Sequence, residues 1–459
     1  MERDSKIPNQ RRRLTRRFAW AAAALLLTSG ELQAQSTEDW GVGSTNLDQL
    51  THFWAAVERS NAPVTVLAFG DSMSLQYQSI QNTLFNRLQA SHGSAGYAFL
   101  DTYNRIGAYF GGGAAWLDPK TTVAPLWWTD QIQLPPDSYV SWADSWYGLG
   151  PVVCDQVGVF WIAHPGGGAF TLSIATNRNV WSAPVMVLDG YSPQPVGRYT
   201  NTTLAQASYW LRADGLSGTN LILSPQLLNR ASTGIRTAYL AKGGANLNEF
   251  FSLSTNITYP ILAALDPQLV VWHMKELGDI GEIGLSNRLF DIEAVWKTCL
   301  TNGDVIYLGT PYDVRDDSRF YTPVENRLLK QAAERDGRGY LDCMSPCLSY
   351  QCMVSKGYMA DIIHINNSGN AYLVNLAWPA LTWSALRTDR RLTLQPAADG
   401  AQTISWLTAT NLTYELQAAT DLRRWSPVHT VQGDGARHAF TDTPTTDGSR
   451  LFRLKLTGN

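Results

Sequence analysis

The residues of this chain that could perform chemistry lie in two short segments far apart in the sequence. The first is Gly70-Asp71-Ser72, which follows the apolar, β-rich run 64–69 and precedes a stretch, 74–88, with apolar residues at helical spacing. A strand that turns into a helix here exposes the Ser72 hydroxyl at the mouth of a sheet. The helix N-terminus then offers backbone N–H groups to a developing negative charge. The pattern predicts that Ser72 is a nucleophile and that Asp71 shapes the turn.

The second segment, Asp361-Ile362-Ile363-His364, contains the partners that a serine nucleophile needs. A hydroxyl is a weak nucleophile until a neighbouring base accepts its proton, and a carboxylate or a carbonyl oxygen fixes the tautomer of that base. We expect His364 to be the base and Asp361 to orient it, with a backbone carbonyl as the alternative orienting group. Together the two segments predict a Ser72–His364–Asp361 triad.

A Gly-Asp-Ser motif early in a domain, with Asp-x-x-His near its end, resembles the SGNH (GDSL) hydrolase family. The resemblance implies hydrolysis of carboxylic esters through a serine nucleophile, with no cofactor. It also implies an oxyanion hole formed by the backbone N–H groups of Ser72 and Gly244 and by an asparagine side chain. This chain departs from the family at the asparagine. An ungapped alignment puts Leu277 there, which cannot donate, whereas a shift of two residues puts Lys275 there. We adopt the shifted alignment.

Strands alternate with helices after residue 236, which indicates a three-layer α/β fold with a parallel sheet. Before that, residues 101–231 show short alternating runs broken by Gly, Pro, Asn and Asp, the pattern of a β-sandwich. This layout resembles the branch of the family typified by bacterial peptidoglycan O-acetyl esterases, in which a β-sandwich is inserted between the serine and glycine segments. Within the second half we expect strands at 269–274 and 305–309, and helices at 247–265, 287–300 and 324–335.

A chain of 459 residues with 44% apolar residues exceeds one ordinary core, so more than one domain is expected. Alternating strands with polar turns after residue 390 resemble the small fibronectin type III-like sandwiches appended to secreted bacterial proteins. We therefore divide the chain into a signal peptide (1–34), a first hydrolase part (35–100), an inserted β-sandwich (101–231), a second hydrolase part (232–386) and a C-terminal β-sandwich (390–459).

The N-terminus has the pattern of an export signal. Five arginines between residues 11 and 17 precede the apolar run 18–27, and Ala34 offers a small residue at a cleavage point. The apolar run is too short for a stable membrane span, so we predict a cleaved signal and a secreted or periplasmic mature protein, with a retained anchor as the alternative. The net charge of −3 and the absence of a long basic cluster beyond the N-terminus argue against a nucleic-acid partner.

The cysteines agree with export. Of the five, Cys343, Cys347 and Cys352 crowd together before the histidine segment. In an oxidising compartment two of these three are expected to pair and steady the approach to His364, and the spacing leaves open which two. A metal site would need histidine or a fourth thiolate at matching spacing, so no zinc is expected.

The tryptophans bear on the substrate, because exposed indole rings stack on sugars whereas buried ones fill cores. We expect most of those in the insert to be core, and Trp127 and Trp128 to line a glycan groove because they follow Pro125 in a loop-like stretch. The function predicted is an exported serine esterase that removes acyl groups, above all acetyl, from a polysaccharide or cell-wall glycan. The alternatives are an esterase of lipids or small esters, and a non-catalytic glycan-binding protein on a decayed hydrolase fold.

Overall fold

The computed structural model divides the chain into two units, Met1–Val42 and Gly43–Asn459. The predicted signal peptide, 1–34, lies outside the described residues. The structure describes residues 43–457 apart from these gaps: 48–49, 60, 76–78, 101–107, 118–125, 128, 143–151, 178–179, 274–276, 301, 312–320, 389–391, 398–400, 409–412, 421–423, 435 and 444–449.

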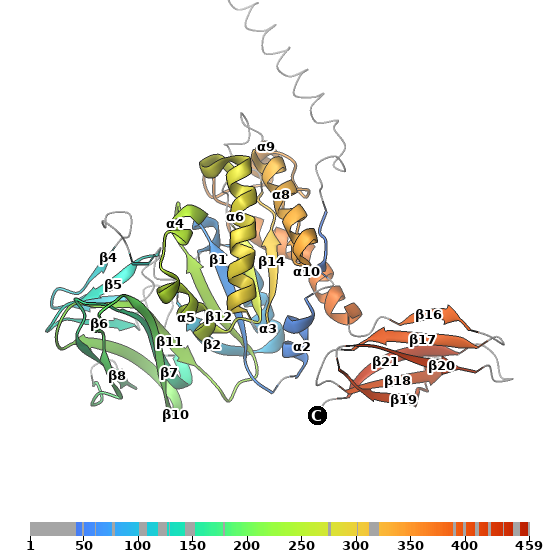
Figure 1. Cartoon of the computed structure of the whole chain (residues 1–459), viewed down its shortest axis with the longest axis horizontal. Helices are drawn as coiled ribbons and strands as arrows, with labels where there is room; N and C mark the ends of the chain where they lie inside the picture. The colour runs from blue at the N-terminus through green and yellow to red at the C-terminus, as the bar shows by residue number, and fades with distance from the viewer. Residues whose placement is uncertain are drawn as a thin grey trace, which may run out of the picture. The chain divides into compact units, whose positions relative to one another are not determined.

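A parallel sheet forms the centre of the hydrolase part (Figure 1). The strand order is β15–β14–β13–β1–β12–β2, and every neighbouring pair in it is parallel. The two neighbours of β1 are β12 on one side and β13 on the other, so the strand order reverses at β1. Open α/β sheets bind their ligands at such a reversal. The bounds are β1 (Val64–Gly70), β2 (Ser94–Phe99), β12 (Ile235–Ala241), β13 (Leu269–His273), β14 (Asp304–Leu308) and β15 (Gly339–Leu341).

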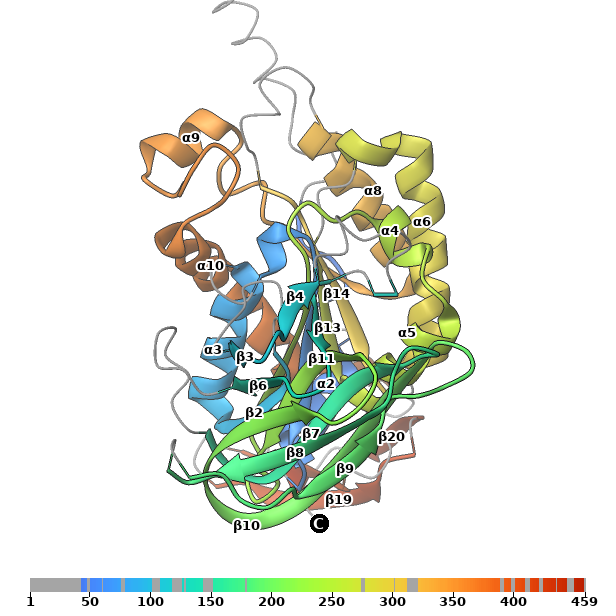
Figure 2. The same cartoon turned by 90° about the vertical axis from the view of Figure 1, so that its left-hand side faces the viewer.

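Helices cover both faces of this sheet because its strands alternate between two apolar cores. Leu67 and Phe69 of β1 belong to one core, and Val66 and Ala68 to the other. The view in Figure 2 shows α6 and α8 on one side of the strands and α3 and α10 on the other. The first core packs against α4 (Leu247–Phe251), α5 (Thr255–Leu265), α6 (Leu277–Cys299) and α8 (Tyr321–Asp336), and the second against α2 (Thr51–Arg59), α3 (Ile80–His92), α9 (Tyr350–Ser355) and α10 (Asn367–Thr388). The predicted three-layer α/β fold is confirmed.

Several helices differ from the predicted bounds, and two of the differences have a clear local cause. The stretch 247–265 forms two helices because the side chain of Ser254 accepts a hydrogen bond from the Asn256 N–H and so starts α5 anew. The helix expected at 287–300 begins at Leu277, and Gly281 (φ 72°) interrupts it with a kink. Local apolar spacing identifies the helical stretches, but a cap or a glycine decides where each helix starts.

The insert is an antiparallel array with an apolar core of its own, which includes Val140, Val159 and Leu211. Its strand β11 pairs with β2, so the insert and the parallel sheet share one continuous hydrogen-bonded ladder. The sequence indicated strands here but not this junction. The strands are β3 (Ala108–Gly111), β4 (Ala115–Leu117), β5 (Gln131–Leu134), β6 (Tyr139–Trp142), β7 (Val152–Ala163), β8 (Ala169–Ala175), β9 (Met186–Asp189), β10 (Val196–Gly215) and β11 (Asn220–Leu228).

The C-terminal strands form two three-stranded antiparallel sheets around a small core of Ile404, Trp406, Tyr414 and Leu416 (Figure 1). The likeness to fibronectin type III units stays a prediction. One sheet contains β16 (Thr393–Pro396), β17 (Gln402–Leu407) and β20 (Arg437–Asp442), and the other β18 (Thr413–Ala419), β19 (Ser426–Gln432) and β21 (Leu451–Thr457).

Within the described part of the chain, every helix is too short or too polar to serve as a membrane span.

Candidate active site

The turn that carries Ser72 follows directly from the buried strand β1. Ser72 begins the 3-10 helix η3 (Ser72–Ser74), and the carboxylate of Asp71 accepts a hydrogen bond from the Met73 N–H at 2.8 Å. The Ser74 N–H bonds to the Asp71 carbonyl at 3.0 Å and closes the turn. Gly70 permits this geometry, because a Cβ at this position would lie 1.8 Å from the carbonyl oxygen of His273. The strand end therefore presents Ser72 at the carboxyl edge of the sheet.

The loop that carries His364 is held by its own polar groups. The Ala360 N–H donates to the His364 carbonyl at 2.8 Å, and the Asn366 side-chain amide donates to the carbonyls of Gly357 and Met359 at 2.7 and 3.1 Å. Asn366 also caps α10, since its Oδ1 accepts from the Gly369 N–H at 3.0 Å. Asn366 was not among the residues predicted to act at the site, although an asparagine just before a helix is a capping signal.

The structure brings the three predicted triad residues together. Nε2 of His364 lies 2.9 Å from Oγ of Ser72, and Nδ1 of His364 lies 2.8 Å from Oδ2 of Asp361. Both distances are within the reach needed for proton transfer and for orientation of the imidazole. With a proton on Nδ1 facing the carboxylate, the lone pair of Nε2 faces the serine hydroxyl.

Asp361 is held in its ionised form. Burial alone would raise the pKa of this carboxyl, but the N–H groups of His364 and Ile363 both donate to Oδ1 at 2.7 Å, and the His364 side chain donates to Oδ2. The net result lowers the pKa of Asp361 to about 2. The carboxylate therefore keeps its charge over the whole pH range in which an imidazole titrates.

Gly244 lies at the same edge of the sheet as Ser72. Gly70 of β1 pairs with Ala241 of β12, and the Lys242 N–H then donates to the Gly70 carbonyl at 3.1 Å. The Ala245 N–H bonds to the Lys242 carbonyl at 3.2 Å, so residues 242–245 form a tight turn in which Gly244 has a φ of 63°. This left-handed conformation favours glycine. A glycine at this position also has no Cβ that could obstruct a substrate approaching its backbone N–H.

An ion pair between a buried lysine and a partly exposed glutamate braces the Gly244 turn. The Lys242 side chain is only 3% exposed, and its Nζ lies 2.6 Å from Oε2 of Glu249 on α4. Asn246 caps the same helix by accepting from the Glu249 N–H at 3.1 Å. This pair was not predicted, and no local signal in the sequence marks it, because the two residues belong to different elements.

The structure supports neither of the two predicted substrate contacts, Trp127 and Trp128, nor the predicted third oxyanion donor, Lys275. Trp127 is fully buried in the core that also contains Phe99, Phe160 and Leu223, so the prediction that it lines a glycan groove is wrong. Pro125 suggested a loop, but the indole of Trp127 is 0% exposed. Trp128 and Lys275 lie outside the described residues.

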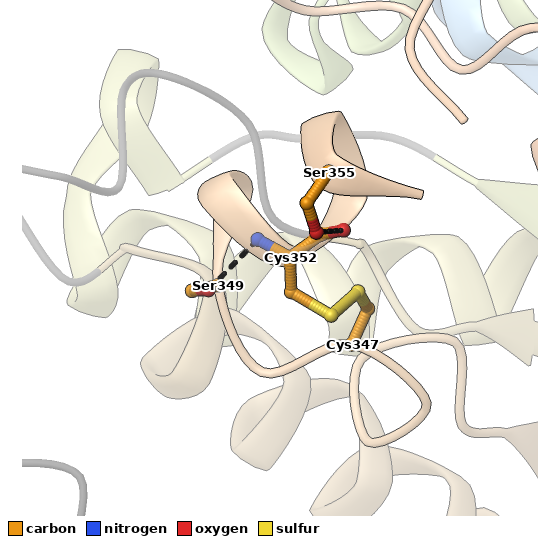
Figure 3. The surroundings of a disulfide bond; sticks show 4 residues. All are labelled: Cys347, Ser349, Cys352 and Ser355. Carbon is orange, nitrogen blue, oxygen red and sulfur yellow. Dashed lines mark hydrogen bonds between the residues drawn. A yellow bond between two sulfur atoms is a disulfide. The ribbon is translucent and has the colours of Figure 1, made fainter. Parts of the chain in front are cut away.

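The structure also answers which cysteines pair. Cys347 and Cys352 form a disulfide across the start of α9, and the Cys352 N–H donates to Oγ of Ser349 at 3.1 Å (Figure 3). The predicted disulfide is thus confirmed. Cys343 is a buried free thiol in the same apolar core, and burial raises its pKa. Among the described residues, no three His, Cys, Asp or Glu side chains gather as a metal site would require.

No protein-family model matches the sequence, and no curated protein matches it. Solved structures do. The one described as a peptidoglycan O-acetylesterase in action superposes with a TM-score of 0.58 at 13% identity, over 74% of this chain and 96% of that chain. A GDSL-like lipase from Parabacteroides merdae covers 33% of this chain and 74% of its own, at 12% identity and a TM-score of 0.26. An acetylxylan esterase from Geobacillus stearothermophilus covers 32% and 73%, at 15% identity and a TM-score of 0.25.

The first of these matches shows that this chain shares the fold of that solved structure. The other two superpositions are too limited to bear on it.

Proposed function

We propose that this chain is an exported serine esterase that removes acyl groups, above all acetyl, from a polysaccharide or cell-wall glycan. The observation that carries the proposal is the continuous hydrogen-bonded line from Ser72 Oγ through His364 to Asp361, with steps of 2.9 and 2.8 Å. This is the arrangement that activates a serine hydroxyl for attack on an acyl carbonyl.

The reaction follows from the geometry. Ser72 Oγ attacks the ester carbonyl while Nε2 of His364 accepts its proton, and the ionised Asp361 stabilises the resulting imidazolium. The negative oxygen of the tetrahedral intermediate accepts hydrogen bonds from the N–H groups of Ser72 and Gly244, with Lys275 as the third donor. His364 then protonates the departing sugar oxygen. Water attacks the acyl-enzyme by the same steps and releases the carboxylic acid.

The class of substrate is supported by the fold. The superposed peptidoglycan O-acetylesterase is matched over 96% of its own length and 74% of this chain. Export is supported by the disulfide Cys347–Cys352, which persists in oxidising compartments, and by the apolar run 18–27 after a cluster of arginines.

The test measures acetate released from O-acetylated peptidoglycan and from acetylated xylan, together with hydrolysis of p-nitrophenyl acetate and p-nitrophenyl octanoate. We expect release of acetate from at least one glycan, and Ser72→Ala should lower every rate by at least about 10³-fold. A fluorophosphonate should label the native protein and leave the Ser72→Ala variant unlabelled.

Two outcomes would contradict the proposal. Preference for the octanoate with no release of acetate from glycans would indicate a lipid esterase. A folded native protein that neither hydrolyses the acetyl ester nor reacts with the phosphonate, yet binds the glycan, would indicate a non-catalytic binding protein.

A further inference from the structure

Ser74 is a fully buried hydroxyl that the proposed reaction does not use, although it lies two residues after the proposed nucleophile. Its Oγ donates to the backbone carbonyl of His273 at 2.9 Å and accepts a hydrogen bond from Nε2 of Gln81 at 2.7 Å. Gln81 is also fully buried. One hydroxyl therefore connects the turn that carries Ser72, the end of β13 and the first turn of α3.

The direction of these hydrogen bonds shows how Gln81 orients the hydroxyl of Ser74. A serine hydroxyl has one proton to donate and two lone pairs to accept with. Because the amide of Gln81 donates to Ser74, the proton of Ser74 is left for the His273 carbonyl. Gln81 thus sets the orientation in which Ser74 joins the nucleophile turn to the neighbouring strand.

The contact between this turn and β13 is close. A Cβ placed on Gly70 would lie 1.8 Å from the His273 oxygen and 2.1 Å from Ser74 Oγ. The Asp71 N–H also points at the His273 carbonyl, but at 3.4 Å, so the Ser74 hydroxyl makes the shorter of these two bonds. His273 is the last residue of β13 before 274–276, the segment in which the sequence places the third oxyanion donor.

We propose that Ser74 and Gln81 are positioning residues that fix the Ser72 turn against the end of β13. They thereby keep the nucleophile in register with the oxyanion donors on either side of β1. This inference rests on the proposed esterase function. It predicts a loss of turnover rather than of substrate affinity, because the geometry of attack matters in the transition state while substrate contacts elsewhere are unchanged.

The experiment compares kcat and KM for p-nitrophenyl acetate and the rate of fluorophosphonate labelling. A displacement of about 1 Å at a reacting group costs up to about 10²-fold in rate, so Ser74→Ala should lower kcat by about 10- to 100-fold with KM within about threefold of native. Labelling should slow in parallel. Gln81→Met, which keeps the volume but removes the donor, should have a smaller effect of the same kind, and Ser74→Thr, which keeps the hydroxyl, should retain most of kcat.

Ser224→Ala is the matched control. Ser224 is likewise 0% exposed, and its Oγ accepts from the Leu100 N–H and donates to the Pro225 carbonyl, each at 2.8 Å, but it lies in β11 of the insert. Its loss should lower the unfolding temperature about as much as the loss of Ser74 and leave kcat at the native value. Unfolding temperatures of all variants separate misplacement of Ser72 from partial unfolding.

If Ser74→Ala and Gln81→Met both keep kcat within threefold of native, the positioning role is wrong. The esterase function would still hold in that case, provided that Ser72→Ala abolishes hydrolysis. A fall in kcat for Ser224→Ala equal to that for Ser74→Ala would also overturn the positioning role, since the loss of any buried hydroxyl would then lower kcat. If Ser74→Ala does not fold, Gln81→Met decides between these outcomes. A native protein with neither hydrolysis nor labelling would overturn both proposals.

Discussion

Asp361→Asn should be more damaging to turnover than Asp361→Ala, although asparagine is the closer replacement in shape. Oδ1 of Asp361 accepts two backbone N–H groups, from Ile363 and His364, at 2.7 Å each, while Oδ2 faces Nδ1 of His364. Two converging donors at Oδ1 select the orientation in which the asparagine oxygen replaces Oδ1. Its NH₂ group then replaces Oδ2 and donates to Nδ1 of His364. This fixes the proton of the neutral imidazole on Nε2, where it cannot accept the proton of Ser72.

The expected loss of kcat in Asp361→Asn depends on this tautomer and on how far the side chains of Asp361 and His364 are exposed to water. An asparagine that forces the wrong tautomer in a Ser-His-Asp triad costs about 10⁴-fold in kcat. The side chains of Asp361 and His364 are 54% and 34% exposed, so water can compensate in part. We therefore expect a loss of about 10³-fold, or about 4 kcal/mol in the activation free energy. Asp361→Ala leaves both tautomers available, with water or a carbonyl next to Nδ1, and should therefore cost less than Asp361→Asn.

The assay is kcat for p-nitrophenyl acetate with native protein and both variants, together with their unfolding temperatures. Asp361→Asn should keep the native unfolding temperature, because the two backbone N–H groups retain an acceptor, whereas Asp361→Ala should unfold at a lower temperature. An asparagine variant that is more active than the alanine variant would refute the argument about the tautomer.

The same carboxylate predicts a dependence of stability on pH. The pKa of Asp361 is lowered from 3.8 to about 2 in the folded chain, so its ionised form stabilises the fold fully above about pH 4. That contribution is lost as the pH falls from about 4 through 2. The difference in unfolding temperature between native protein and Asp361→Ala should therefore shrink between pH 5 and pH 2.5. A difference that stays constant over this range would contradict the lowered pKa.

Three further predictions concern the elements around the site. Replacing Cys347 and Cys352 by serine should lower the free energy of unfolding by about 2 kcal/mol, measured in urea, because the loop that they close is short; an unchanged value would mean that the disulfide does not form. Glu249→Gln should destabilise the protein more than Lys242→Met, because the first leaves a lysine that is 3% exposed without its partner and the second a glutamate that is 36% exposed; thermal unfolding that ranks them the other way would contradict this. Lys275→Ala should lower kcat by about 10²-fold with little change in KM, and full turnover would remove Lys275 from the oxyanion hole.

Features that depend on neighbouring residues could be predicted from the amino-acid sequence. The apolar run 64–69 becomes β1, and the turn after it follows because Asp71 bonds to the N–H two residues later. Asp361 and His364 are three residues apart, close enough for one carboxylate to cap the loop and orient the imidazole. Short-range spacing and hydrogen-bonding capacity are sufficient for such features.

Only the tertiary structure decided what depends on packing between distant segments. Ser72 and His364 are 292 residues apart, and they meet because the parallel sheet and the covering helices bring β1 and the loop before α10 to one edge. Trp127 follows a loop-like stretch but is fully buried in the larger apolar core. The bond between Ser74 and the His273 carbonyl spans 199 residues. Local periodicity has no information about which surfaces meet, since burial and long-range pairing depend on how the whole core fills.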